Sequence, residues 1–114
     1  MTSDPIDSDT RRAVDLFVQG VAGHWDTVGA FLFGSRARKT HRADSDADVA
    51  VILRGAPGAF MPAMRIMDDI AFDVLLTTGI RVQPLPIWEQ EWRRPERYSN
   101  PLLLANIARD GVPV

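Results

Sequence analysis

Two acidic residues near the middle of the chain, Asp46 and Asp48, have the spacing of a metal-binding pair. They open an apolar stretch that is typical of a strand, and side chains two positions apart on a strand share one face, with α-carbons about 6.5 to 7 Å apart. Two carboxylates on one face repel each other unless a cation lies between them. Mg²⁺ uses one or two carboxylates and completes its shell with water and substrate phosphates. The pair therefore predicts a site for Mg²⁺, or for Mn²⁺, beside a phosphorylated molecule.

A Gly-Ser turn, Gly34-Ser35, precedes these carboxylates. Gly34 has no side chain, so the backbone there can turn sharply and approach a ligand closely. If a helix begins at Ser35, its free N–H groups and the serine hydroxyl would stabilise an anion such as a phosphate. Turn and carboxylates together predict a nucleoside triphosphate whose phosphates are held at the turn and whose metal ion is held by Asp46 and Asp48. Such an ion would stabilise charge in an in-line displacement at phosphorus.

The same segment also fits other interpretations. Asp46 and Asp48 also fit a polar turn leading into a strand. A P-loop is excluded, because it would need glycines where Phe33 and Arg38 stand before Lys39. The basic residues between the turn and the aspartates also fit a solvated loop; they are Arg36, Arg38, Lys39 and Arg42.

The elements that must position these residues follow from the apolar pattern. Residues 1–8 are expected to form a frayed polar arm that ends at a helix cap at Ser8 or Asp9. A stripe at helical spacing then predicts an amphipathic helix, and its members are Val14, Phe17, Val18, Val21, Ala22 and Trp25. Residues 28–33 are continuously apolar and predict a strand buried on both faces and ended by Gly34. Residues 35–45 are too polar for the core and predict a solvated turn with at most a short helix.

The second half of the chain completes the fold. After the strand that opens at Asp46, helical spacing predicts a long helix over 60–78, ended by Gly79. Two prolines in 80–87 predict an edge strand or one that stops early. A short helical turn over 88–92 would follow, and a last helix over about 100–110 has Asn100 as its cap. This order predicts an α/β or α+β sheet with helices mainly on one face.

Composition sets the broad class. The 114 residues are 46% hydrophobic and 25% charged with a net charge of −2, as in one soluble globular domain over 1–114 with its motif core at 28–53. The absence of cysteine excludes disulfides and a cysteine nucleophile. With no signal peptide and no apolar run near the roughly 18 residues of a membrane span, a cytoplasmic protein without a membrane partner is expected. The near-zero charge argues against direct nucleic-acid binding.

The segment that contains the turn and the two aspartates resembles a known family. Gly34-Ser35 followed by Asp46-x-Asp48 and an apolar strand is similar to the GS-x(n)-D-x-D signature of the DNA-polymerase-beta-like nucleotidyltransferase superfamily. The strings GSRAR and SDADVAV most resemble its minimal nucleotidyltransferase (MNT) branch, small proteins often paired with a HEPN-domain partner in toxin–antitoxin modules. The matching element order extends over residues 9–87. The resemblance implies a mixed sheet with flanking helices, ATP and Mg²⁺ binding, and nucleotidyl transfer with pyrophosphate leaving.

The resemblance also implies roles by matching position. Gly34 and Ser35 would bind the phosphates, and Asp46 and Asp48 would ligate the metal and form the catalytic pair. Arg36 and Arg38 would neutralise charge on the triphosphate.

One position departs from the family pattern. Full members carry a third carboxylate, commonly taken as the base for the attacking hydroxyl, on the strand after the long helix. Here that strand has Gln83 or Arg81 where the acid is expected, and neither is a carboxylate. Asp73 falls within the predicted helix, and Glu89 and Glu91 lie beyond the strand.

Three hypotheses follow from this pattern. The first is an enzyme that transfers AMP from ATP to a hydroxyl of a partner protein, since the chain is too short for a separate acceptor-binding domain. The second is a catalytically weakened or inactive antitoxin that neutralises a HEPN-type ribonuclease, a helical protein, by binding it. The third is an antibiotic-modifying nucleotidyltransferase, which would normally need an additional helical domain. The sequence leaves open whether the chain forms a homo-oligomer, and whether Trp88 and Trp92 pack in the core or face a partner.

Overall fold

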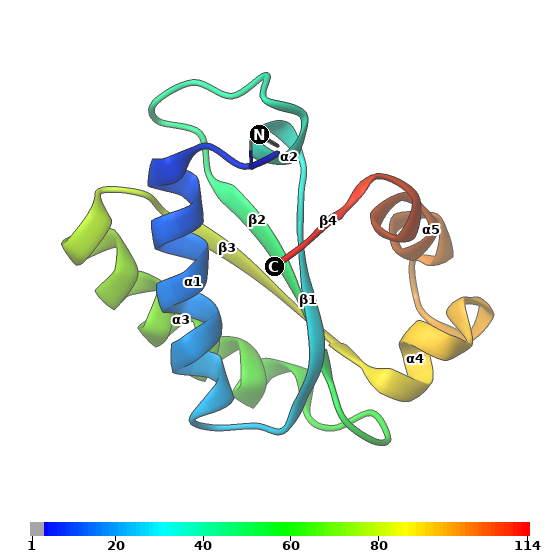
Figure 1. The fold of residues 1–114 in the computed structure, drawn as a ribbon. Coiled ribbons are helices and arrows are strands. Elements are labelled where there is room, and N and C mark those ends of the chain that lie inside the picture. The colour runs from blue at the N-terminus through cyan, green and yellow to red at the C-terminus, as the bar shows by residue number, and fades with distance from the viewer. Residues whose placement is uncertain (1–3) are drawn as a thin grey trace.

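The computed structural model describes residues 4–114 and has two layers of helices around a mixed sheet (Figure 1). The strands lie in the order β3-β2-β1-β4; β1 is antiparallel to β2 and β4, and β2 is parallel to β3. In chain order the elements are α1 (Ser8–Ala22), β1 (Thr27–Phe33), α2 (Ser35–Arg38), β2 (Ala47–Leu53), α3 (Phe60–Thr78), β3 (Val82–Trp88), α4 (Glu89–Arg93), the 3-10 turn η1 (Pro95–Arg97), α5 (Pro101–Asp110) and β4 (Val112–Pro113). The mixed α+β fold expected from the sequence is confirmed.

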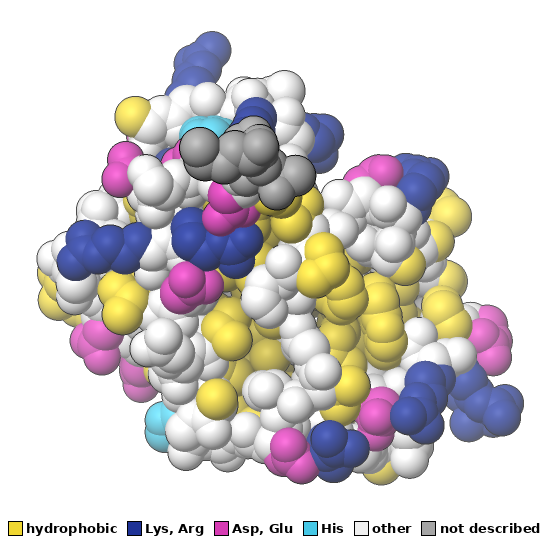
Figure 2. Space-filling view, in the orientation of Figure 1, with side chains coloured by type: hydrophobic (Ala, Val, Ile, Leu, Met, Phe, Trp, Pro, Cys, Tyr) yellow, Lys and Arg dark blue, Asp and Glu magenta, His cyan; other side chains and the backbone are white. Residues whose placement is uncertain are grey.

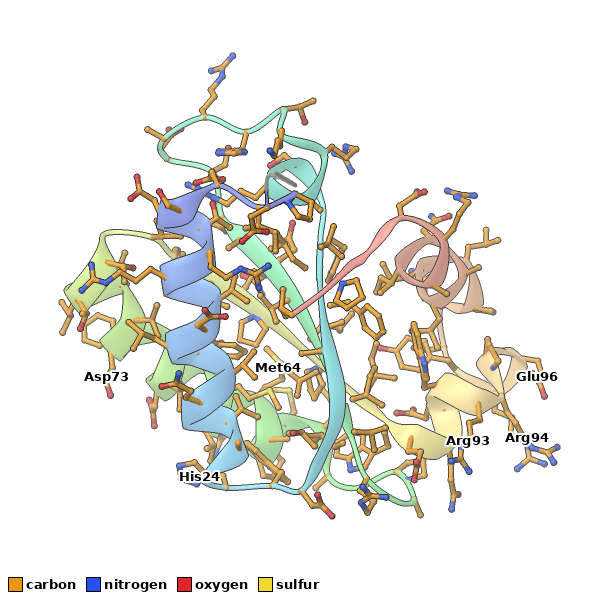
Figure 3. All side chains as sticks on the ribbon, viewed as in Figure 1. His24, Met64, Asp73, Arg93, Arg94 and Glu96 are labelled. Atoms are coloured by element: carbon orange, nitrogen blue, oxygen red, sulfur yellow. The ribbon has the colours of Figure 1, made fainter. Side chains whose placement is uncertain are left out.

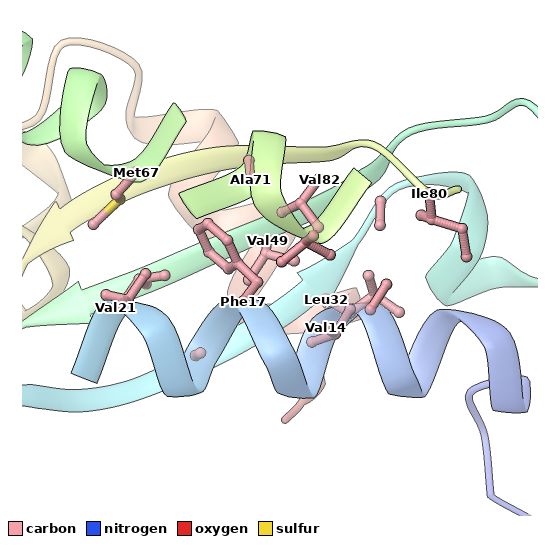
Figure 4. Close-up of a cluster of buried hydrophobic side chains, with 14 of the residues drawn as sticks. Val14, Phe17, Val21, Leu32, Val49, Met67, Ala71, Ile80 and Val82 are labelled. Atoms are coloured by element: carbon pink, nitrogen blue, oxygen red, sulfur yellow. The ribbon is translucent and has the colours of Figure 1, made fainter. Parts of the chain in front are cut away.

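The main core lies between the sheet and the two long helices. Val14, Phe17 and Val21 of α1 pack with Met67 and Ala71 of α3 against the sheet (Figure 4). Inward-facing strand residues complete this core: Ala30, Leu32, Ala47, Val49, Val51, Leu53 and Val82. On the other face of the sheet a smaller cluster joins Ala50 and Ile52 of β2 and Ile87 of β3 to Leu104 and Ile107 of α5. The two long helices therefore cover one face, and the short C-terminal helices cover part of the other.

The start of α1 differs from expectation. Asp7, rather than Ser8 or Asp9, is the N-cap, and its carboxylate accepts hydrogen bonds from Thr10 N at 3.1 Å and Thr10 Oγ1 at 2.8 Å. Ile6 is 2% exposed, and Asp4 accepts hydrogen bonds from Arg11. A frayed arm is therefore wrong for residues 4–7, because the buried Ile6 anchors them; residues 1–3 lie outside the described part of the chain.

Strand β1 is buried on one face only. Ala30 and Leu32 are buried in the main core, whereas Phe31 and Phe33 are half-buried and Val28 is 46% exposed. The prediction of a strand buried on both faces is wrong because α5 and β4 cover the second face incompletely. Figure 2 shows hydrophobic side chains gathered between α1 and α5, over β1 and β4.

The long helix and the strand after it match their predictions. Helix α3 spans 60–78, and Gly79 takes the left-handed conformation (φ 79°) and donates its N–H to Leu75 O. Strand β3 is an edge strand and pairs with β2 along its whole length, so it does not stop early. Arg81 O accepts from Ala47 N, so by alternation Pro84 and Pro86 face away from β2, where a proline removes no ladder hydrogen bond.

The C-terminal elements show what becomes of the two tryptophans. Trp88 ends β3 and packs in the main core, whereas Trp92 of α4 stacks on Phe31 on the opposite face, with ring centroids 5.3 Å apart. They do not share a helix face, because the strand continues through Trp88. Both serve packing within this chain.

Helix α5 has the predicted cap, since Asn100 Oδ1 accepts from Leu103 N. Gly111 then has an ordinary backbone (φ −66°) and is needed for space, because a Cβ there would press on Ile107 O. Strand β4, which pairs with Phe31 and Leu32, was not predicted because two residues carry no alternating pattern. No helix in residues 4–114 has the length and apolar character needed to span a membrane.

Candidate functional site

The Gly-Ser turn and Asp48 lie directly against each other. Phe33, the last residue of β1, pairs with Asp48 of β2, so the turn leaves β1 beside that carboxylate. Gly34 has φ 77° and ψ −157°, a conformation open essentially to glycine alone. A Cβ at position 34 would collide with Asp48 Oδ2. Glycine is therefore required twice, for its backbone and for the close approach.

Asp46 and Asp48 interact electrostatically. Partial burial raises the pKa of Asp48 above its ordinary value, the charge of Asp46 raises it further, and Arg38 opposes this shift. The sequence predicted that the strand opens at Asp46. In the structure strand β2 begins at Ala47, so Asp46 lies in the loop just before the strand. Asp46 is exposed and Asp48 is half-exposed, so both carboxylates are open to solvent and to a ligand.

The two arginines of the GSRAR string have different environments. Arg38 is exposed, and its charge acts on Asp48. Arg36 is 3% exposed and its guanidinium points into the protein, where Nη1 donates to Thr10 Oγ1 at 2.7 Å. Its other donors reach the backbone carbonyls of the loop before β2, at Ser45, Ala43 and Arg42. The structure thus assigns Arg36 to the support of this loop, in place of the expected contact with a triphosphate, and corrects the view that 35–45 contribute nothing to the core.

Helix α2 presents donors beside Asp48. Its first intrahelical hydrogen bond runs from Arg38 N to Gly34 O at 3.2 Å, so the N–H groups of residues 35–37 have no acceptor within the helix. The helix ends at Lys39 in the left-handed conformation after a single turn. With only four residues, α2 contributes individual N–H groups and the Ser35 hydroxyl, and its macrodipole is small.

The sheet register decides which residue takes the place expected for a third acid. In the parallel pair of β2 and β3, Asp48 lies beside Gln83, and Gln83 is exposed. Arg81 lies before β3, where its carbonyl accepts from Ala47 N. Gln83 is therefore the residue next to Asp48, a question that the sequence left open between Gln83 and Arg81. Within residues 4–114 no group of three or more His, Cys, Asp or Glu side chains could hold a metal.

The donor set fits a hard divalent cation whose remaining ligands come from a substrate and water. Two carboxylates, open to solvent on one side and flanked by N–H donors on the other, are the oxygen ligands that Mg²⁺ takes when phosphates and water complete its octahedron. Burial is the main cause of the raised pKa of Asp48, and the charge of Asp46 adds to it; a bound cation would relieve the repulsion between the two carboxylates.

A second group of arginines lies at the other end of the sheet. Arg93 and Arg94 project from the α4 end of the molecule, far from α2 (Figures 1 and 3). A cavity of about 360 Å³ lies there; it is lined by Pro57, Gln90, Glu91, Arg93, Arg94 and Arg97. This cavity contains neither aspartate of the pair, so the chemistry of Asp46 and Asp48 belongs to an open surface and not to this hollow.

Sequence reasoning missed the residues that support the site from behind. Thr10 and Asp7, at the start of α1, are joined to the loop through Arg36. No local pattern marks them, because they lie far from the GSRAR string in sequence and a threonine near a helix start usually serves the helix alone.

Comparison with known proteins agrees with this geometry. The family model described as "Polymerase beta, Nucleotidyltransferase" matches residues 21–83, more than half of the chain. The chain is also similar to the crystal structure of a candidate nucleotidyltransferase from Sulfolobus solfataricus, with 20% identity and a TM-score of 0.54 over 98% of this chain and 87% of that one, a likeness of fold. No curated protein matches the sequence. The matched family model, which covers the Gly-Ser turn and both aspartates, shows that the chain belongs to the polymerase beta nucleotidyltransferase family.

Proposed function

We propose that this domain binds ATP with Mg²⁺ and transfers AMP to a hydroxyl group of a partner protein. The observation that carries the proposal is the packing of Gly34 against the Asp48 carboxylate, which brings the N–H donors of the turn and a carboxylate to one point. In the reaction the acceptor oxygen bonds to the α-phosphorus and its proton passes to solvent; the bond between the α-phosphorus and the oxygen that bridges to the β-phosphorus breaks, and pyrophosphate leaves.

Each site residue has a role set by its chemistry. The N–H groups after Gly34 and the Ser35 hydroxyl would donate hydrogen bonds to phosphate oxygens. Arg38, exposed beside Asp48, would balance triphosphate charge. Asp46 and Asp48 would hold the cation, which when bound neutralises phosphate charge and orients the attacking oxygen.

A second candidate function is favoured by Gln83. An amide beside Asp48 can donate a hydrogen bond to an acceptor hydroxyl, but it cannot take its proton as a carboxylate does. A domain that keeps the nucleotidyltransferase fold with weakened or absent catalysis would then act by binding, and the partner proposed for it is a HEPN-type ribonuclease that it neutralises as an antitoxin.

Binding and transfer are tested separately. Titration calorimetry with a non-hydrolysable ATP analogue and Mg²⁺ should show metal-dependent binding that Asp48→Asn reduces by at least about tenfold, while Asp44→Asn, in the same loop, leaves it unchanged. Asp44 is a matched control because it is exposed and of the same type. Equal affinities for the wild type and Asp48→Asn would rule out the site.

Transfer is measured with ATP labelled at the α-phosphate and a partner protein purified as a complex with this chain. The enzyme proposal expects label on the partner, and more label with Gln83→Glu, which restores a carboxylate beside Asp48. Gln90→Glu on exposed α4 is the control for the added charge. If no variant transfers label to the partner, and the Asp46→Asn variant still neutralises the ribonuclease activity of the partner, the binding function replaces the enzymatic one.

A further inference from the structure

The loop that leads to Asp46 is held by one buried arginine. Arg36 Nε donates to Ser45 O at 3.0 Å, and Nη2 donates to Ala43 O at 3.2 Å and, more weakly, to Arg42 O at 3.4 Å. These carbonyls belong to the residues immediately before Asp46. A guanidinium is planar and presents its donors as a rigid fork, so contacts with several carbonyls restrict the loop to one arrangement.

The same guanidinium is fixed from the opposite side by α1. Its Nη1 donates to Thr10 Oγ1 at 2.7 Å, and this hydroxyl in turn donates to Asp7 Oδ1 at 2.8 Å. Thr10 is fully buried, and Asp7 is the N-cap of α1. His41, from the loop itself, also contacts Asp7, with Nε2 3.3 Å from Oδ1. The start of α1 thus anchors the loop in two ways, through Arg36 and through His41.

We propose that Arg36 is a positioning residue of the nucleotide site: anchored on Thr10, it holds the loop over 42–45 so that Asp46 stays beside Asp48. The inference rests on the proposed nucleotide and metal binding. Asp46 lies outside the strand, so the sheet ladder does not fix it as it fixes Asp48. The loop hydrogen bonds through Arg36 supply what the ladder lacks.

The first test reads the loop itself and needs no ligand. In Arg36→Lys a single ammonium keeps the positive charge but loses the fork of donors. Amide hydrogen exchange of Arg42 N, which donates to Ser45 Oγ, and of Ser45 N, which donates to Arg42 O, should accelerate by about tenfold or more while amides of β1 and β2 keep their protection. Arg12→Lys, on the exposed side of α1, should change neither. Unchanged exchange at the loop in Arg36→Lys would overturn the proposal.

Thr10→Val provides a second variant of nearly the same shape. It removes the acceptor on α1 and leaves the carbonyl contacts of Arg36 in place. It should also accelerate amide exchange in the loop, but by a smaller factor than Arg36→Lys. If Arg36→Lys does not fold, Thr10→Val decides, and exchange equal to the wild type would count against the anchor.

The second test distinguishes positioning from a general loss of structure. The probe is Mn²⁺ with a non-hydrolysable ATP analogue, and the readout is the affinity measured by electron paramagnetic resonance. Arg36→Lys should weaken Mn²⁺ binding by about 10- to 100-fold in the wild-type background. In an Asp46→Asn background the same change should have almost no further effect, because the residue being positioned has already lost its charge. Equal losses in both backgrounds would overturn the proposal.

The proposed function and the positioning role of Arg36 can fail separately. If the wild type binds neither Mn²⁺ nor the analogue, the proposed function fails, and hydrogen exchange alone decides whether Arg36 holds the loop. If the wild type binds both and Arg36→Lys changes neither exchange nor affinity, the site stands and the positioning role fails.

Discussion

The two faces of the sheet differ in how completely they are covered. On the face under α1 and α3, the side chains of Val14, Phe17 and Met67 are fully buried. On the other face, Phe31 and Phe33 are only half-buried beneath α5 and Trp92. Asp48 and Gln83 belong to this second face, because they alternate with the inward-facing residues of β2 and β3.

The difference separates stability from chemistry. A sealed face supplies most of the apolar burial that stabilises the fold, and it can do so without any polar group. An incompletely covered face leaves room for carboxylates, an amide and a ligand, at a cost in packing. Changes on the first face should therefore act on folding, and changes on the second should act mainly on binding.

The largest expected effect comes from opening the sealed face. Phe17→Ala should lower the free energy of unfolding by about 3 to 5 kcal/mol, because it leaves a cavity between α1 and the sheet. Phe31→Ala removes an aromatic ring of the same size from the half-covered face and should cost clearly less. Urea denaturation of both variants measures the contrast, and equal costs would show that the two faces contribute alike.

A smaller effect on stability is expected at the Gly34 turn beside Asp48. Gly34→Ala should destabilise the protein by about 1 to 3 kcal/mol, because alanine is strained at this backbone conformation, and should also displace the Asp48 carboxylate. Gly29→Ala is the matched control, since its Cβ would meet nothing within 4 Å and its φ is not positive. Thermal denaturation and metal titration report the two effects. A Gly34→Ala protein with normal stability and binding would contradict the geometry.

The cap of α1 should contribute about as much as a typical N-cap. Asp7→Ala should cost about 1 kcal/mol at neutral pH, since it removes the acceptor for Thr10 N. Burial alone would raise the pKa of Asp7, but its hydrogen bonds from Thr10 lower the pKa below the ordinary value of 3.8. The ionised carboxylate therefore stabilises the fold above pH 3.8, and this contribution is lost as the pH falls through the lower, folded-state pKa.

Denaturation of the wild type and Asp7→Ala at several pH values tests this sign. The gap between the free energies of unfolding of the two proteins should narrow as the pH falls below about pH 4. A gap that widened below about pH 4 would mean that the ionised carboxylate is destabilised in the fold.

The smallest expected effect is a gain in stability on the open face. The pKa of Asp48 is raised by its burial and by Asp46, so its ionised form opposes folding at neutral pH. Asp48→Asn should raise Tm slightly, while it weakens metal-dependent nucleotide binding by at least about tenfold. Differential scanning calorimetry measures the first effect. A lower Tm would show that Asp48 serves the fold.

Local patterns were enough to predict the elements that contain their own signals. The helix over 60–78 could be predicted because its stripe and Gly79 lie within it. Pro84 and Pro86 limited β3 to an edge strand or one that stops early, and the turn at Gly34 followed from the residue itself. Gln83 could not be separated from Arg81, because only the register with β2 decides which of them lies beside Asp48.

The role of Arg36 could not be predicted for a different reason. Arginine in a polar segment is usually solvated, and its burial depends on a hydroxyl of α1 and on carbonyls that the loop presents only after folding. The same holds for Asp46, whose place outside the strand reflects where the ladder with β3 begins.

The outer edge of β3 limits how another protein can join this domain. Of its outward-facing backbone positions, Pro84 and Pro86 have no N–H, and the N–H of Trp88 already donates to Glu91 Oε1, so only that of Val82 is left for a further strand. A further strand would find too few donors there to extend the sheet. This edge is thus protected from pairing with a further strand, and a protein that docks against it would be recognised through side chains.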